Sequence, residues 1–301
     1  MSDFNYLKGV YNITPTPFHP DGSLDQESLA RLTNFIIDKG VNGLTILGVL
    51  GESHKVSETE RERIVTTVLE ATAGRVPICV GTSHAATGQC IAYSQQAEEL
   101  GAKAVMVAPP KLARSNDAAL RRHYLAVAEA INLPIAIQDH PASSGVYMSV
   151  DFIANIAQES AQCRFLKLEE EPCPTKITKI LAANPDVQIF GGLGGMMFLE
   201  ELRHGAVGTM TGFAFPEILV EIYQKFSRGD IDGATDVFYR YCPLIRFENQ
   251  QLINLALRKQ IYYQRGAIAS PHVRAPFTPV DEDTLADLQD LLRRLQLIAA
   301  I

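Results

Sequence analysis

The sequence has no excess of basic residues. Its 301 residues include 27 Lys and Arg against 34 Asp and Glu, which gives a formal net charge of −7. Proteins that bind nucleic acid neutralise phosphates with a basic face, so this balance argues against nucleic acid as a partner. A small anionic substrate is still compatible with the sequence, because it needs only one local positive group.

Long apolar runs are also absent. No run reaches the roughly 18 residues that a membrane-spanning helix requires. The first ten residues, MSDFNYLKGV, show neither the basic nor the apolar region of a secretory signal. The sequence therefore predicts a cytoplasmic protein with no membrane as partner. Apolar residues nevertheless make up 47% of the chain, enough for a large core.

Cysteines are few, odd in number and scattered. No pair forms a C-x-x-C motif or has the spacing of zinc ligands. A disulfide framework and a structural metal site are therefore both disfavoured. The five are Cys79, Cys90, Cys163, Cys173 and Cys242.

Short apolar runs that favour strands alternate along the chain with longer amphipathic stretches. Strands are expected at 9–15, 43–48, 77–82, 104–108, 134–139, 163–168, 187–191 and 206–211. Helices are expected at 27–39, 57–73, 86–100, 117–131, 149–159, 174–183, 196–204 and 216–228, the second opening with a capping box from Ser57 to Glu60. Such alternation implies parallel strands joined by right-handed crossovers, and eight units fit a closed (β/α)8 TIM barrel.

A doubly wound open sheet is the alternative architecture. That fold normally carries a G-x-G-x-x-G loop after its first strand, and no such loop follows 9–15. The glycine-rich segment 191–195 follows the seventh strand instead, where it forms either a tight turn or a loop that approaches a substrate anion. We therefore favour the barrel.

The last 70 or so residues contain no long strand-like run. Helical spacing occurs over 231–241, 247–264 and 281–299, broken by prolines that include Pro243. At about 150 residues per domain, the length alone would suggest two domains. The pattern instead predicts a barrel over 1–230 and a C-terminal helical extension over 231–301.

Lys167 lies inside an apolar run, Phe165-Leu166-Lys167-Leu168. A strand buried on both faces would otherwise carry Val or Ile there. Burial favours the neutral amine, which is the form that attacks a carbonyl to give a Schiff base. The alternative is a lysine that only pairs with Glu169 or Glu170, and spacing alone supports both interpretations.

Other polar residues at expected strand ends carry weaker signals. His84 follows the third strand and is either a general base or an ordinary loop residue. Glu169 shares the i, i+2 side of its strand with Lys167 and can face inward. Glu52 is expected to hold its own loop by hydrogen bonds to backbone amides.

These residues resemble the dihydrodipicolinate synthase / N-acetylneuraminate lyase family over the whole length of the chain. The matching features are Thr16-Pro17-Phe18, the loop Gly48–Ser53, the segment 57–61, the stretch that ends at Pro110, and Lys167. The resemblance implies a class I lyase of 2-keto acids that needs neither metal nor cofactor and assembles as a homotetramer. It also implies that Lys167 forms a Schiff base with C2 of the substrate and that the loop Gly48–Ser53 receives the substrate carboxylate.

The departures from the family pattern are informative. The family usually places a catalytic tyrosine after strand five, where this chain has Gln138-Asp139-His140-Pro141. Val49 and Leu50 replace the two hydroxyl residues of the carboxylate loop, and Pro110 and Lys111 replace a tyrosine pair. These changes argue against a true dihydrodipicolinate synthase or sialic acid lyase.

One subgroup, the L-2-keto-3-deoxyarabonate dehydratases, is similar at several altered places. The shared motifs are Q-D-x-P-A-S from Gln138, K-x-E at Lys167, T-S-H from Thr82, M-T-G-x-x-F-P from Met210 and P-L-I-x-x-E-N from Pro243. The resemblance thus suggests a dehydratase of a 2-keto-3-deoxy sugar acid. A pyruvate-dependent aldolase, a synthase-like enzyme and a keto-acid-binding protein without turnover are the alternatives.

The predicted catalytic residues are Lys167, Glu169 and His84. The predicted substrate-binding residues are Gly48, Val49, Leu50, Ser53, Gln138, Gly191 and Met210.

Overall fold

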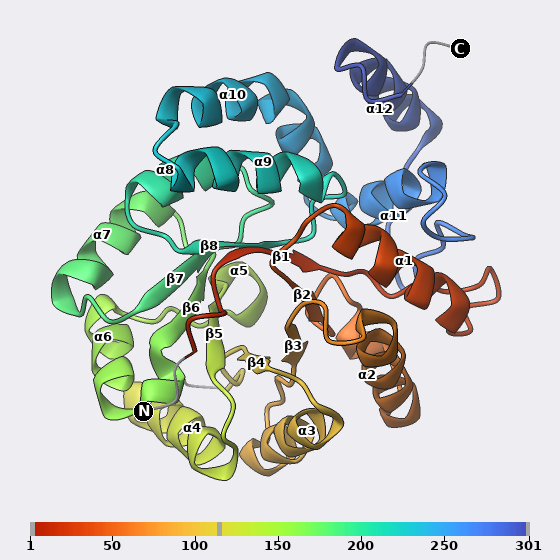
Figure 1. Ribbon diagram of the computed structural model, residues 1–301. Helices are drawn as coiled ribbons and strands as arrows, with labels where there is room; N and C mark the ends of the chain where they lie inside the picture. Colours follow the sequence, from red (N-terminus) through yellow and green to blue (C-terminus); the bar gives the residue numbers. More distant parts are fainter. Residues whose placement is uncertain (1–3, 113–115, 299–301) are drawn as a thin grey trace.

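Eight parallel strands close into a barrel in which each strand pairs with its neighbours in chain order, and β8 returns to β1 (Figure 1). The computed structural model describes residues 4–112 and 116–298. The strands are β1 (Gly9–Ile13), β2 (Gly43–Ile46), β3 (Ile78–Gly81), β4 (Ala104–Val107), β5 (Ile135–Asp139), β6 (Phe165–Leu168), β7 (Gln188–Gly191) and β8 (Gly208–Thr211). The predicted (β/α)8 fold is confirmed.

The barrel interior is filled by side chains from alternate strand positions. Tyr11, Cys79, Met106, Phe190 and Met210 are all buried in one apolar cluster. The opposite faces of the strands pack on the surrounding helices, which explains why each strand reads as an unbroken apolar run. The predicted strand 163–168 begins too early, because its first two residues belong to a 3-10 turn, η2 (Ala161–Arg164).

Helices connect the strands and form the outer ring. They are α1 (Gln26–Asp38), η1 (Ser53–Lys55), α2 (Glu58–Thr72), α3 (Thr87–Leu100), α4 (Asp117–Ala130), α5 (Pro141–Ser144), α6 (Val150–Glu159), α7 (Cys173–Ala183), α8 (Phe198–Arg203) and α9 (Pro216–Ser227). The capping box at α2 is present: the Glu60 amide donates to Ser57 Oγ, and the Ser57 amide donates to the Glu60 carboxylate.

The helical extension differs from expectation at Pro243. Helix α10 (Ile231–Glu248) continues past this proline, so the break predicted at Pro243 is wrong. A proline inside a helix costs about 3 kcal/mol, which burial of the adjacent Leu244 and Ile245 offsets. The chain turns just after, where Leu252 has a φ of 72°.

The predicted helix 247–264 is therefore shared between α10 and α11 (Asn254–Gln264). The last helix, α12 (Glu282–Arg294), is shorter than the predicted 281–299, and residue 299 lies outside the described residues. Figure 1 shows α11 beside α1, and α12 farther out from the barrel.

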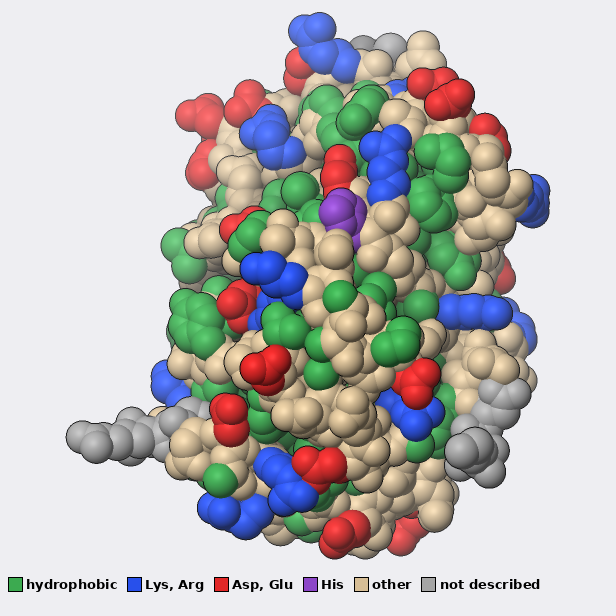
Figure 2. Space-filling model, turned by 90° about the vertical axis from the view of Figure 1, so that its left-hand side faces the viewer, with side chains coloured by type: hydrophobic (Ala, Val, Ile, Leu, Met, Phe, Trp, Pro, Cys, Tyr) green, Lys and Arg blue, Asp and Glu red, His purple; other side chains and the backbone are tan. Residues whose placement is uncertain are grey.

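The surface carries charges of both signs. Figure 2 shows acidic and basic side chains interspersed over the face that it draws. Within residues 4–112 and 116–298, no helix is long and apolar enough to cross a membrane.

Candidate active site

A pocket of about 680 Å³ lies at the carboxyl ends of the strands. Its walls come from the loop after β2, from β5 and β6, from the loop after β7, and from the start of α11. In TIM barrels this end of the strands carries the active site. Five of the predicted site residues line the pocket: Lys167, Glu169, Gln138, Val49 and Leu50.

Lys167 projects from β6 into the pocket. It is paired in register with Gln138 on β5 and Phe190 on β7, so the three side chains share the inner face of the barrel. Lys167 Nζ lies 2.7 Å from Glu169 Oε2, and the side chains are 3% and 8% exposed. Gln138 Nε2 donates to the same oxygen at 2.8 Å. The structure thus joins an amine, a carboxylate and an amide in one contact group.

Two consecutive glycines separate Glu169 from a second carboxyl group. A Cβ on Gly192 would clash with the Glu169 side chain, and a Cβ on Gly191 would clash with the carboxyl group of Glu201 on α8. Gly191 therefore faces Glu201, and of these two glycines Gly192 lines the pocket. The predicted substrate-binding residue Gly191 thus lies next to the pocket lining.

Glu201 is buried behind the pocket, and neither carboxyl oxygen has a hydrogen-bond partner among the described residues. Burial, and then the nearby charge of Glu169, raise the pKa of Glu201 to about 8. The group is therefore protonated near neutral pH, which avoids the cost of an unpaired charge in the protein interior.

The loop after β2 lines the pocket with Val49 and Leu50. The amides of Gly51, Glu52 and Ser53 are used inside the loop, where they donate to the carbonyls of Gly48, Val49 and Gly48 respectively. The amides of Val49 and Leu50 have no partner among the described residues. Unpaired amides at a pocket wall are the kind of donor that binds a carboxylate.

Glu52 ties this loop to the C-terminal extension. It is fully buried with a φ of 54°, and its carboxylate accepts from Lys259 Nζ at 2.5 Å and Lys55 Nζ at 3.1 Å. It also accepts from the backbone amide of Arg274 at 3.1 Å. The expectation that Glu52 bonds to amides of its own loop is wrong. Its partners are Lys55, which follows the loop, and Lys259 and the Arg274 amide of the C-terminal extension. Burial lowers the pKa of Lys259 to about 8.

The extension also supplies one wall of the pocket, which sequence reasoning missed. Arg258 on α11 lines the pocket with a side chain only 3% exposed. Its Nε donates to Glu248 at 2.8 Å and its Nη2 to Asn249 at 3.2 Å. The shared P-L-I-x-x-E-N motif, which ends at Glu248 and Asn249, was the signal that could have located this wall.

Some predicted residues do not line the pocket. His84 is exposed, and its Nδ1 accepts from the Ala86 amide. Gly48 and Ser53 support the loop after β2 through its internal hydrogen bonds. Met210 fills the barrel interior.

Asp139, directly after Gln138, points away from the pocket into a buried ion-pair cluster. Lys176 Nζ on α7 lies 2.6 Å from both Asp139 and Glu170. Burial raises the pKa of Asp139 to about 6 despite the ammonium beside it. Lys176 therefore holds Glu170 at the rim of the pocket. The positive charge of Lys176 is compensated by Asp139 and Glu170.

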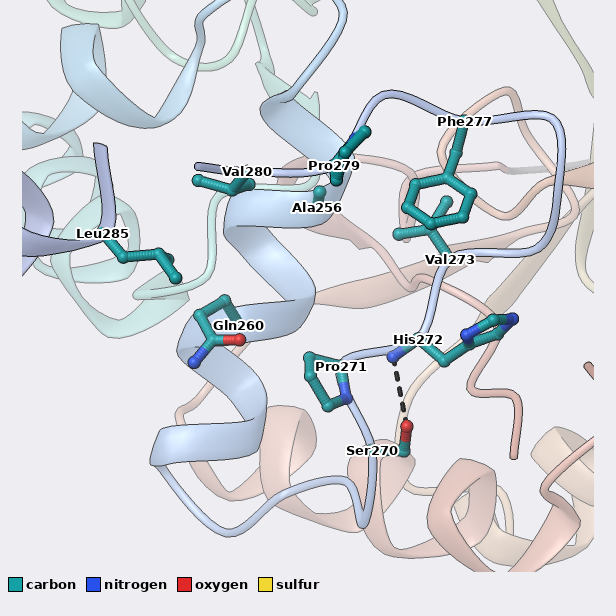
Figure 3. A pocket seen from close by; sticks show the side chains of 10 residues that line it. All are labelled: Ala256, Gln260, Ser270, Pro271, His272, Val273, Phe277, Pro279, Val280 and Leu285. Carbon is teal, nitrogen blue, oxygen red and sulfur yellow. Dashed lines mark hydrogen bonds between the residues drawn. The ribbon is translucent and has the colours of Figure 1, made fainter. Parts of the chain in front are cut away.

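A second hollow, of about 260 Å³, lies between α11, the segment 270–280 and α12 (Figure 3). No Lys, Arg, Asp or Glu lines it, and none of its residues comes from a barrel strand. Its chemistry does not match that of the first pocket, so the candidate active site is the pocket around Lys167.

Comparison with known proteins identifies the family. The model of the dihydrodipicolinate synthetase family matches residues 6–295. The chain belongs to this family. Within the described parts of the chain, no three His, Cys, Asp or Glu side chains are grouped so that they could hold a metal ion.

Relatives within the dihydrodipicolinate synthetase family carry different names. An L-2-keto-3-deoxyarabonate dehydratase of Azospirillum brasilense is 35% identical, over 96% of this chain and 94% of the relative. A 4-hydroxy-tetrahydrodipicolinate synthase of Methanothrix thermoacetophila is 29% identical, over 96% and 97%. A crystal structure of a dihydrodipicolinate synthase from Rhodopseudomonas palustris superposes with a TM-score of 0.90 at 33% identity, covering 96% of this chain and 98% of that one. Membership in the family alone therefore does not identify the substrate, which has to be inferred from the residues of the site.

Proposed function

We propose that this protein is a Schiff-base-forming dehydratase of a 2-keto-3-deoxy sugar acid, of the L-2-keto-3-deoxyarabonate type. The observation that carries the proposal is the contact between Lys167 and Glu169 in a pocket that is also lined by Val49 and Leu50, whose backbone amides are unpaired among the described residues. The 35% identity to a dehydratase of that name supports the substrate class.

In this mechanism Lys167 acts as the nucleophile. Its neutral amine, after passing a proton to Glu169, attacks the C2 carbonyl of the substrate to give a carbinolamine. Glu169 returns that proton to the carbinolamine hydroxyl, whose loss as water gives an iminium ion and leaves Glu169 ionised again. The substrate carboxylate is held by the amides of Val49 and Leu50. The iminium acidifies C3, so that a base can remove a proton from that carbon.

Glu169 is the proposed base, since it is the carboxylate in contact with Lys167. It takes the C3 proton to give an enamine, then returns a proton to the C4 hydroxyl, which leaves as water. Hydrolysis of the resulting conjugated iminium consumes one water, the equivalent of that lost on its formation, and restores Lys167. The unsaturated keto acid that is released tautomerises to the semialdehyde, as C5 and its hydroxyl each lose a hydrogen and C3 and C4 each gain one. Gln138 holds the carboxylate in place where the family pattern has a tyrosine. His84 is not proposed for this role, because it is exposed and does not line the pocket.

Borohydride trapping tests the nucleophile. Incubation with pyruvate and borohydride should add the mass of the reduced adduct at Lys167. A Lys111→Ala variant, which removes an exposed lysine, should be labelled normally. An adduct that persists in Lys167→Ala would exclude the proposed nucleophile.

Product analysis separates dehydration from carbon–carbon cleavage, because both reactions share the enamine. A dehydratase converts a 2-keto-3-deoxypentonate to a semialdehyde, whereas an aldolase releases pyruvate. Glu169→Gln should lower dehydration turnover by about 10²–10⁴-fold. Pyruvate as the main product would favour the aldolase, and reversible binding without an adduct would favour a non-catalytic protein.

Homotetramer assembly, which the resemblance implies, and a cytoplasmic location, which follows from the sequence pattern, both stay predictions. Analytical ultracentrifugation of the purified protein would test the first.

A further inference from the structure

Arg258 is a buried cation whose guanidinium is only partly used by the protein. It lies on α11 and lines the pocket around Lys167, and its side chain is 3% exposed. We infer that Arg258 binds the carboxylate of the keto-acid substrate through the Nη1–Nη2 edge of its guanidinium, beside the loop after β2. The inference rests on the proposed function and adds a residue of the C-terminal extension to the binding site.

One edge of the guanidinium is held by the protein. Arg258 Nε donates to Glu248 Oε1 at 2.8 Å, and Nη2 donates one hydrogen to Asn249 Oδ1 at 3.2 Å. Glu248 is itself fixed, since its carboxylate also accepts from the backbone amide of Ala214. An arginine carries five N–H groups, so both groups on Nη1 and one on Nη2 have no partner among the described residues. The guanidinium is therefore held in one orientation with its Nη1–Nη2 edge vacant.

The vacant edge is open to the pocket. Within the described residues, no nitrogen of Arg258 is among the fully enclosed polar atoms that lack a hydrogen-bond partner, so the unpartnered Nη1 is reachable from the pocket that Arg258 lines. A Cβ on Gly212 would lie 3.5 Å from Nη1 and 2.7 Å from Leu50 Cδ1, which places Nη1 beside the loop after β2. Because β8, β1 and β2 are consecutive in the barrel, Arg258 and this loop border the same side of the pocket.

The loop after β2 has no charged or hydroxyl donor where it lines the pocket. Its lining residues, Val49 and Leu50, have apolar side chains, so it offers a carboxylate only their backbone amides. A guanidinium gives charge-assisted hydrogen bonds, which are about twice as strong as bonds between neutral groups. Arg258 therefore supplies the strong donors of an anion site that the loop completes.

The charges of the pocket favour the same assignment. Lys167 and Arg258 are the Lys and Arg side chains that line it within the described residues, and three consecutive glutamates, residues 169–171, line it too. An anionic substrate therefore needs a cationic group in order to bind there. Lys167 is the proposed nucleophile, which leaves Arg258. Glu248 occupies only the other edge of this guanidinium, and the planar pair of N–H groups on the vacant edge matches a carboxylate.

Pyruvate and pyruvamide test the inference, because pyruvamide keeps the keto group and replaces the carboxylate by an uncharged amide. The measured quantity is the concentration of each compound that gives half-maximal trapping at Lys167 with cyanoborohydride. The wild type should prefer pyruvate. In Arg258→Gln the half-maximal concentration of pyruvate should rise at least about tenfold, as expected when hydrogen bonds between charged groups are lost, while that of pyruvamide should change by less than about threefold.

Further variants separate binding from folding, because Arg258→Gln leaves Glu248 buried without its cation. The double variant Arg258→Gln/Glu248→Gln removes both charges and should show the same loss of preference for pyruvate. Arg258→Lys keeps the charge without the planar pair of donors and should lose part of the preference. Arg122→Gln, which removes an exposed arginine of α4 outside the pocket lining, is the matched control and should keep the full preference.

Binding to Lys167→Ala distinguishes this inference from the proposed function, because that variant cannot form a Schiff base. Calorimetry should still show tighter binding of pyruvate than of pyruvamide, and adding Arg258→Gln should abolish the difference. Equal affinities for the two compounds in Lys167→Ala would overturn the inference. If the wild type is trapped but folded Arg258 variants keep the full preference for pyruvate, the inference is wrong and the proposed chemistry stands. If the preference depends on Arg258 while no adduct forms in the wild type, the carboxylate site stands and the proposed chemistry is rejected.

Discussion

At the scale of single residues, the site is organised by how its carboxyl groups are partnered. Glu169 contacts Lys167 and Gln138, and Glu248 contacts Arg258. Glu201 has no such partner, and burial raises its pKa to about 8. It is therefore the carboxyl group of this region whose protonation should couple most directly to stability.

Glu201 predicts a pH-dependent stability. Its pKa is about 8 in the folded state and about 4.3 in an unfolded chain, so the folded state binds more protons between these values. Stability should therefore fall as pH rises from about 4.5 to about 8, by on the order of a few kcal/mol. Denaturant unfolding across this range should show a smaller decline in Glu201→Gln than in the wild type. Parallel curves for the two proteins would contradict the assignment.

At the scale of elements, two consecutive glycines at the end of β7 have different roles. Gly191 makes room for Glu201 on the helix side, and Gly192 makes room for Glu169 on the pocket side. An added methyl group at either position would displace a different carboxyl group.

The two glycines thus form a matched pair of variants. Gly192→Ala should lower kcat by at least about tenfold, because a misplaced catalytic group loses rate steeply, with a modest change in melting temperature. Gly191→Ala should mainly destabilise the fold, by about 1–3 kcal/mol from overpacking. Measuring kcat and thermal unfolding on both variants checks this division, and equal losses of activity would refute it.

At the scale of the whole molecule, the barrel could be predicted from the sequence, whereas the pocket wall formed by the C-terminal extension could not. A strand that is buried on both faces appears in the sequence as a run of apolar residues. Lys167 is conspicuous because it interrupts such a run. Arg258 and Lys259 look like ordinary charged residues of an amphipathic helix. They can be buried because each has a carboxylate partner. Arg258 pairs with Glu248, and Lys259 pairs with Glu52, which is 207 residues away from it in the chain. Local periodicity carries no information on such long-range pairs.

The pair of Lys259 and Glu52 should stabilise the contact between extension and barrel. Lys259→Met leaves Glu52 with fewer partners at a fully buried position, so we expect a loss of about 3 kcal/mol. Adding Glu52→Gln to that variant should restore part of the stability, since it removes the buried charge. A double-mutant cycle from chemical denaturation measures the coupling, and strictly additive effects would argue against it.

Neighbouring positions on α11 thus support the pocket in two ways. Arg258 lines it, and Lys259 bonds to Glu52 in the loop after β2, whose residues Val49 and Leu50 also line it. A shift of this one helix would therefore move two parts of the pocket lining together.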